Sequence, residues 1–119
     1  MTKTYQYGYR TPRFAVDFPC LLQTEGPNSL TLQARCLDIS EQGIAVQLSE
    51  YLSVGAQVTL ILTLPGAPRP QRIAAKVSNR QGRDHGMTLI FDSPQEQADL
   101  QKYLVNIHSE PVILKHRPK

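Results

Sequence analysis

Apolar residues occupy every second position in six short stretches of this chain, and turn-forming residues separate the stretches. The stretches are residues 14–22, 30–36, 44–48, 58–64, 73–77 and 87–91. A period of two is typical of a β-strand that buries one of its faces. Six antiparallel strands in sequence favour closure into a barrel, because a closed barrel leaves no strand edge exposed. We therefore predict an all-β fold built as a six-stranded antiparallel β-barrel.

Prolines mark two irregular places in this pattern. Pro19 lies within the first stretch and has no N–H to donate, so this strand is expected to lie at an edge or to carry a bulge. The residues Glu25-Gly26-Pro27-Asn28 favour a turn, and the first two stretches are therefore expected to form a hairpin. Segment 65–70 is too rich in proline to continue a strand, so the fourth strand ends before it.

One helix is expected near the C-terminal end. Ser93 is suited to the N-cap, Pro94 to the first helical position and Glu96 to the third, which together form a capping box. An apolar stripe with helical spacing follows, made of Leu100, Tyr103, Leu104 and Ile107. This stripe either closes one end of the barrel or forms a docking face for another protein.

The chain of 119 residues has room for one domain. We expect a single domain over residues 1–119, with its core at about 9–107, a basic N-terminal segment at 1–13 and a tail at 108–119. In the tail, Pro111–Leu114 is interpreted either as a short added strand or as an apolar extension. No stretch approaches the roughly 20 apolar residues that span a bilayer, and the first ten residues lack the apolar part of a secretory signal. A cytoplasmic protein with no membrane span is expected.

The net charge of +3 is small, but the basic residues are unevenly distributed. They gather in residues 1–13, in the stretch from Arg69 to Arg83, and at the C-terminal end. Such clusters indicate either an anionic partner, from a nucleotide to nucleic acid or lipid, or simply solvated strand faces.

Catalytic and metal-binding motifs are absent from the sequence. The three histidines lack metal-ligand spacing, and neither a nucleophile elbow nor a phosphate-binding loop of the P-loop type is present. Cys20 and Cys36 form no close pair and are expected to be buried thiols that act as small apolar residues. We therefore expect no enzyme, no metal and no cofactor.

Two polar segments carry the candidate binding chemistry. Asp38, Ser40 and Gly43 lie between two predicted strands, where a carboxylate and a hydroxyl two residues apart point the same way and a glycine permits close approach. A carboxylate beside a hydroxyl complements the N–H donors of guanine. Upstream, Arg10 and Arg13 offer planar guanidinium groups suited to phosphate oxygens, to guanine and to stacking on flat rings.

The order of these features resembles the PilZ domain family. The resemblance covers about residues 9 to 105 and includes the basic N-terminal segment, the D-x-S-x-x-G motif formed by Asp38, Ser40 and Gly43, Gly86 near the start of the last strand, and the closing helix. It implies a six-stranded barrel with a C-terminal α-helix that binds cyclic di-GMP. In that family an R-x-x-x-R segment wraps over the ligand, and the D-x-S-x-x-G turn contacts a guanine.

The arginine motif of the family matches this chain in two alternative ways. If Arg13 is the second arginine, Tyr9 takes the first position, where its ring can stack on a purine. If Arg10 is the first arginine, the spacing is one residue short. The resemblance thus implies ligand contacts by Tyr9, Arg10, Arg13, Asp38, Ser40 and Gly43.

Three functions follow as hypotheses. The first is a cyclic di-GMP receptor that orders its N-terminal arginine segment over the nucleotide and signals to an unidentified effector protein. The second is a ligand-independent PilZ-like adaptor in a motility, pilus or exopolysaccharide system. The third, a general nucleic-acid binder, is disfavoured because the three phenylalanines fall in core positions and Tyr5, Tyr7 and Tyr9 bunch at one end. We expect cyclic di-GMP and an effector protein as partners, and no nucleic acid.

Overall fold

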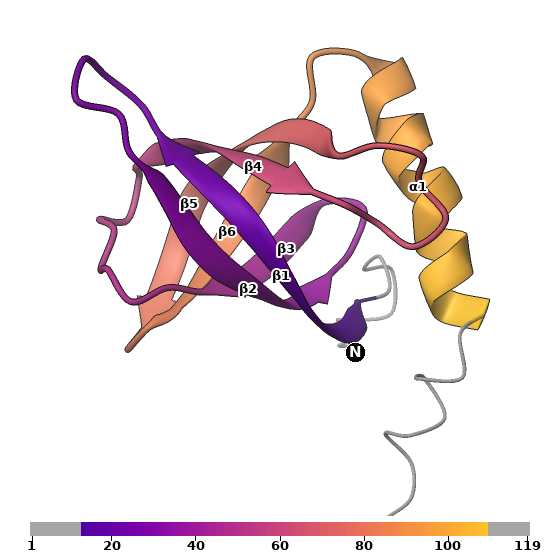
Figure 1. The fold of residues 1–119 in the computed structure, drawn as a ribbon, viewed down its shortest axis with the longest axis horizontal. Coiled ribbons are helices and arrows are strands. Elements are labelled where there is room, and N and C mark those ends of the chain that lie inside the picture. Colours follow the sequence, from indigo (N-terminus) through magenta and orange to yellow (C-terminus); the bar gives the residue numbers. More distant parts are fainter. Residues whose placement is uncertain (1–12, 110–119) are drawn as a thin grey trace, which may run out of the picture.

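The computed structural model describes residues 13–109, with side chains described through Ile107. Six antiparallel strands close into a barrel in the order β1-β2-β3-β6-β5-β4, and a single helix follows them (Figure 1). The elements are β1 (Phe14–Thr24), β2 (Thr31–Ile39), β3 (Gly43–Gln47), β4 (Gln57–Leu62), β5 (Gln71–Gln81), β6 (Asp84–Ile90) and α1 (Pro94–Ser109). The predicted all-β barrel with one C-terminal helix is confirmed.

The core of the barrel is formed by the inward-facing apolar residues of all six strands. Burial alternates along β4 and β6, as the period of two predicts. Leu22, Leu60 and Ile73 are among the fully buried side chains, and Cys20 and Cys36 are also buried in this core. The two thiols are therefore small core residues, as predicted.

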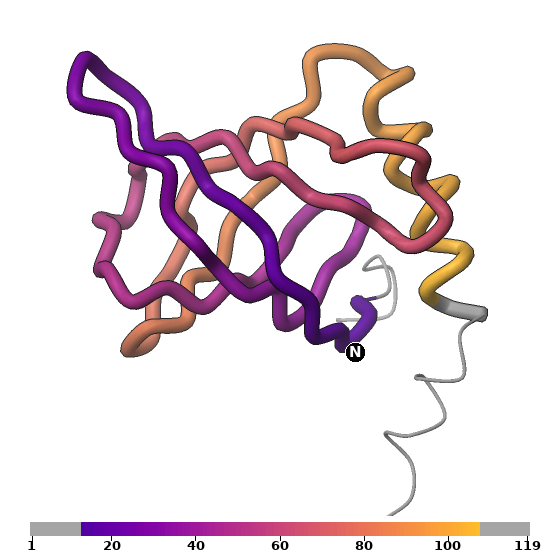
Figure 2. Tube along the Cα trace, in the orientation of Figure 1, coloured from indigo at the N-terminus to yellow at the C-terminus, as the bar shows by residue number. Residues whose placement is uncertain are grey.

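Leu30 is an exception to the predicted alternation. Its side chain is 59% exposed, whereas the sequence pattern placed it on the buried face of the second strand. Leu30 lies before β2 and forms two hydrogen bonds with Thr24. The Leu30 amide donates to Thr24 Oγ1 at 2.8 Å, and the Thr24 amide donates to the Leu30 carbonyl at 2.9 Å. The β1–β2 hairpin projects from the barrel at the end away from α1 (Figure 2), and Leu30 lies in the connection of this hairpin.

β1 is irregular where proline predicted it to be. Its pairing register with β2 shifts between Ala15 and Phe18, which marks a bulge. Pairing with β4 begins only at Leu21, so Pro19 lies in a part of the strand that is paired with β2 but not with β4. The missing N–H of Pro19 therefore costs the β1–β4 ladder nothing.

α1 begins at Pro94 and has the predicted cap. The Glu96 amide donates to Ser93 Oγ at 3.2 Å, and the Glu96 carboxylate accepts from the Asp92 amide at 2.8 Å, one residue earlier than a regular capping box. Leu100, Leu104 and Ile107 are buried in the core, so the apolar stripe covers the barrel end next to the β4–β5 connection (Figure 1). Within residues 13–109, no helix has the length and apolar character needed to cross a membrane.

Candidate functional site

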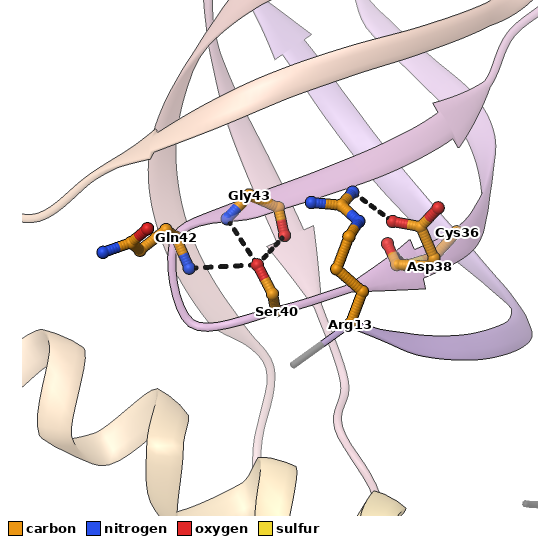
Figure 3. Close-up of polar contacts among 6 residues, drawn as sticks. All are labelled: Arg13, Cys36, Asp38, Ser40, Gln42 and Gly43. Atoms are coloured by element: carbon orange, nitrogen blue, oxygen red, sulfur yellow. Dashed lines mark hydrogen bonds and ion pairs between the residues drawn. The ribbon is translucent and has the colours of Figure 1, made fainter. Parts of the chain in front are cut away.

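The turn between β2 and β3 is closed by the side chain of Ser40. Its Oγ accepts hydrogen bonds from the amides of Gln42 at 3.2 Å and Gly43 at 3.0 Å, and it lies 3.3 Å from the Gly43 carbonyl, to which it can donate (Figure 3). The Ser40 amide donates to the same carbonyl at 2.8 Å. Ser40 is only 1% exposed. Its hydroxyl therefore holds the shape of the turn, as in a Ser/Thr turn.

Gly43 lies where two strands and an arginine approach closely. A Cβ atom at this position would be 3.1 Å from the Met87 carbonyl oxygen on β6 and 3.4 Å from Arg13 Nη1. The backbone oxygen of a paired strand cannot move aside easily, so the glycine is required by close approach rather than by an unusual backbone angle.

Arg13 and Asp38 form an ion pair between Arg13 Nη2 and Asp38 Oδ1 (Figure 3). Arg13 directly precedes β1, and the pairing of Phe14 with Ile39 and of Ala15 with Asp38 brings it alongside the end of β2. The two side chains are 49% and 34% exposed, so both remain accessible to a ligand. Asp38 and Ser40 rise from the same side of the chain, but only the carboxylate faces another side chain.

A cavity of about 430 Å³ opens beside this turn. Its lining comes from the start of β1, the β2–β3 turn and the neighbouring parts of β5 and β6, and consists of Arg13, Ser40, Gln42, Gly43, Ser78, Asn79, Gly86, Met87 and Thr88. This volume falls within the range of small-molecule sites. The structure thus brings Arg13, Asp38, Ser40 and Gly43 together, while Tyr9 and Arg10 lie outside the described residues.

Sequence reasoning missed the wall of the cavity that β5 and β6 provide. The Oγ of Ser78 and the Oγ1 of Thr88 lie 2.6 Å apart in a hydrogen bond, and Asn79 follows next to them. The pairing register of β5 and β6 shifts between Val77 and Asn79, which turns both polar residues outward. The only sequence signal for this polar wall is that the alternating apolar residues of the predicted strand 73–77 end before Ser78 and Asn79.

α1 is connected to the outer end of the same turn. Gln97 Nε2 donates to the Glu41 carbonyl at 3.4 Å, and Gln101 Nε2 donates to Glu41 Oε1 at 2.7 Å. The backbone of the turn is further tied to β6 by the Leu89 amide, which donates to the Gln42 carbonyl at 2.9 Å. The turn is therefore held by three sets of hydrogen bonds: those of Ser40 within it, that of Leu89 on β6, and those of Gln97 and Gln101 on α1.

His85 has a structural position that the sequence did not indicate. It is fully buried, and its Nε2 accepts a hydrogen bond from the Leu52 amide at 3.0 Å. Its Nδ1 lies 2.9 Å from the Arg83 carbonyl, to which it donates in the neutral tautomer that this acceptor role requires. His85 thus fastens the β3–β4 connection to the barrel and lies apart from the cavity lining.

The buried thiols lack the features of a reactive site. Burial raises the pKa of Cys20 to about 11, and burial together with the neighbouring Cys20 and Asp38 raises the pKa of Cys36 above its ordinary value. Both cysteines are free, and within the described part of the chain no cluster of three or more histidine, cysteine or acidic residues is placed to hold a metal ion.

Comparison with known proteins identifies both the family and the fold. The PilZ domain family model matches residues 9–106. The fold is similar to the PilZ domain with cyclic di-GMP of YcgR from Escherichia coli, with a TM-score of 0.70 and 16% identity over 92% of this chain and 98% of that one. It is also similar to the PilZ domain of CeSA from a cellulose-synthesizing bacterium, with a TM-score of 0.67 and 15% identity over 82% of this chain and 99% of that one.

A longer protein contains the same fold. The cyclic di-GMP complex of MrkH from K. pneumonia matches with a TM-score of 0.66 and 18% identity, over 95% of this chain but only 55% of MrkH. A comparison with curated proteins gives no match.

Proposed function

The chain belongs to the PilZ family, and on that premise we propose that it is a cyclic di-GMP receptor that signals to a partner protein. PilZ domains are binding and adaptor domains rather than enzymes. The YcgR and MrkH structures named above contain cyclic di-GMP. The proposal assigns the same ligand to the cavity between the β2–β3 turn and the β5–β6 wall.

The observation that carries this proposal is the pairing of Asp38 with Arg13, which lines the cavity. A guanidinium group binds phosphate oxygens through two parallel hydrogen bonds, and a carboxylate accepts hydrogen bonds from N1–H and N2–H₂ of guanine. One cyclic dinucleotide offers both kinds of group. The two residues therefore match the two chemical parts of the proposed ligand.

The ion pair has to be exchanged when the ligand binds. Both side chains are more than one-third exposed, and pairs of this kind contribute only about 0–1 kcal/mol to stability. In the proposed complex a phosphate replaces Asp38 beside Arg13, and guanine N–H groups replace Arg13 beside Asp38. The exchange replaces the one Arg13–Asp38 contact by charged hydrogen bonds at both residues, so separating the pair is inexpensive.

Ser40 and Gly43 take supporting roles in this proposal. Ser40 keeps the turn in shape, since its hydroxyl is occupied by the Gln42 and Gly43 amides. Gly43 keeps the cavity floor open beside Arg13. We expect their effect on binding to arise from the geometry of the turn.

Tyr9 and Arg10 precede Arg13 by four and three residues. In the proposed receptor, segment 1–13 becomes ordered over the nucleotide, with Arg10 at a phosphate and Tyr9 stacked on a base. Such an ordering step changes the surface offered to an effector protein. This is how ligand binding would be signalled to another chain.

A ligand-independent adaptor in a motility, pilus or exopolysaccharide system is the second candidate. The observation that favours it is that Asp38 and Arg13 already satisfy one another without a ligand. A stable complex with a partner protein in the absence of nucleotide, combined with no uptake of cyclic di-GMP, would support this candidate over the receptor.

An amide-shift titration with cyclic di-GMP tests the receptor proposal and locates the site. Shifts are expected at Arg13, at residues 38–43 and along the β5–β6 wall. Residues 25–29, in the β1–β2 hairpin, serve as an internal reference because they lie outside the cavity lining. No shifts with protein at tens of micromolar, or shifts confined to the hairpin, would contradict the proposal.

A further inference from the structure

Asn79 lies against Gly86 in an arrangement that depends on the missing side chain of the glycine. A Cβ atom on Gly86 would lie 2.8 Å from both Nδ2 and Oδ1 of Asn79 and 3.0 Å from its Cγ. Three atoms of the carboxamide are thus almost equally distant from that point. The flat face of the amide therefore lies against Gly86.

The bulge in β5 produces this arrangement. The pairing register of β5 with β6 shifts between Val77 and Asn79. On one side of the shift Val77 pairs with Met87, and both are buried. On the other side Asn79 pairs with Gly86. With Ser78 accommodated in the bulge, Asn79 lies on the outer face, opposite a residue without a side chain. Gly86 has no positive φ, so its conformation is open to any residue and the close approach alone explains the glycine.

The Asn79 carboxamide has hydrogen-bonding capacity that the protein leaves unused. It makes no hydrogen bond with the described residues, although it lines the same cavity as Arg13 and Gly43. The Ser78–Thr88 hydroxyl pair beside it uses one hydrogen in its internal bond, and Ser78 Oγ lies 3.5 Å from the Lys76 carbonyl, to which it can donate. The pair therefore offers a ligand its remaining acceptor capacity. This wall is neutral, whereas the opposite side of the cavity carries the charged guanidinium of Arg13, paired with Asp38.

From this geometry we infer that Asn79, seated on Gly86, contacts the edge of a purine base of the bound nucleotide and determines how tightly that base is held. The inference rests on the proposed function. A carboxamide offers one donor and one acceptor side by side, which matches the O6 and N1–H of guanine in a two-bond contact. The adjoining hydroxyl pair can accept one further bond at the same edge.

The inference separates base recognition from phosphate recognition in the cavity. Arg13 supplies charge for a phosphate, while Asn79 with Ser78 and Thr88 supplies uncharged hydrogen bonds for a base. Gly86 acts only by leaving space for the Asn79 amide. Its effect on ligand binding therefore passes through Asn79.

A double-mutant cycle in the full-length chain tests this arrangement with cyclic di-GMP as the probe. Asn79→Ala is expected to weaken binding roughly tenfold, since the variant loses both hydrogen bonds to the base. Asn79→Leu, which keeps the size but removes the hydrogen bonds, should weaken it equally. Gly86→Ala should weaken binding by displacing the amide, and it should have no further effect in the Asn79→Ala background.

Controls distinguish this inference from the proposed function. Gln33→Ala removes an exposed carboxamide on the outer face of β2, away from the cavity, and should bind as the wild type does. The melting temperatures of all variants should match that of the wild type within a few degrees. The Asn79 and Gln33 side chains are exposed, and a Cβ atom at Gly86 would meet only the flexible side chain of Asn79.

The results separate a failure of the Asn79 inference from a failure of the receptor proposal. If the wild type binds and Asn79→Leu binds equally well, the inference is wrong and the receptor proposal stands. Additive effects of Asn79→Ala and Gly86→Ala would also overturn it. A wild-type protein that does not bind cyclic di-GMP would overturn the receptor proposal and this inference together.

Discussion

The Ser40 hydroxyl accepts a hydrogen bond from the Gly43 amide at 3.0 Å, entirely within the turn that borders the cavity. The same oxygen accepts from the Gln42 amide at 3.2 Å, and Ser40 is 1% exposed. A serine that would be taken from sequence alone as a ligand contact is therefore the internal support of the turn. On this basis Ser40 holds the turn, whereas the exposed side chains of Arg13 and Asp38 are available to the proposed ligand.

Ser40→Ala should destabilise the fold as well as weaken binding. The substitution leaves the buried Gly43 amide and the partly buried Gln42 amide without their acceptor, which costs about 1–3 kcal/mol. Urea unfolding of the variant and of Ser49→Ala, an exposed serine, measures this difference. Equal stability of Ser40→Ala and the wild type would show that the turn does not depend on this hydroxyl.

Gly43→Ala should distort the junction of β3 and β6. Its new Cβ would lie 3.1 Å from the Met87 carbonyl, a backbone atom held in the sheet, so we expect a loss of about 1–3 kcal/mol. Gly86→Ala is the matched control, because there the new atom meets only the flexible Asn79 side chain. Thermal unfolding should rank Gly43→Ala clearly below Gly86→Ala, and the reverse order would contradict the close-approach explanation.

Asp38→Asn should weaken ligand binding while leaving the fold intact. The exposed ion pair with Arg13 contributes at most about 1 kcal/mol, but a charged acceptor for guanine is worth about 1.5–3 kcal/mol, or roughly tenfold or more in affinity. Asp17→Asn makes the same change in the pair of Asp17 with Arg35, and this arginine, unlike Arg13, does not line the cavity. Calorimetry should show weaker binding only for Asp38→Asn; an equal loss in both variants would point to a general charge effect.

The buried thiols should make the fold less stable at alkaline pH. Burial raises the pKa of Cys20 from 9.0 to about 11 and also raises that of Cys36. Below about pH 9 the thiols are protonated in both states and contribute no pH dependence. Above it the unfolded chain loses these protons and the folded chain keeps them, so the free energy of unfolding falls by up to about 1.4 kcal/mol per pH unit for each thiol.

Urea unfolding between pH 8 and 10.5 measures this slope. Lysine and tyrosine residues also titrate in this range, so the double variant Cys20→Ala/Cys36→Ala provides the comparison. Its stability should be lower at pH 8 because of lost packing, but should decline less steeply. Identical slopes for the variant and the wild type would exclude the thiols as the cause.

The elements with strong local signals could be predicted from the sequence. The alternating apolar residues predicted all six strands, and the cap at Ser93 and Glu96 predicted the start of α1 because capping depends on residues that are close along the chain. Leu30 was assigned wrongly, since alternation cannot show that a hairpin extends past the barrel it belongs to.

The site itself was predicted only in part. The sequence indicated Arg13, Asp38, Ser40 and Gly43, and the structure brings them together at one turn. It did not indicate Asn79, because the bulge that turns this residue outward is a property of pairing between β5 and β6. It also did not indicate that Glu41 is bound by α1, a contact between residues about 60 positions apart.

Isothermal titration of cyclic di-GMP into the wild-type chain and into Arg13→Ala tests the receptor proposal most directly. Arg35→Ala is the matched control, because it removes an arginine from the second Arg–Asp pair without changing the cavity lining. The proposal predicts saturable binding by the wild type and by Arg35→Ala, and binding at least about tenfold weaker for Arg13→Ala. No heat from the wild type with protein at tens of micromolar, or Arg13→Ala binding as tightly as the wild type, would contradict it.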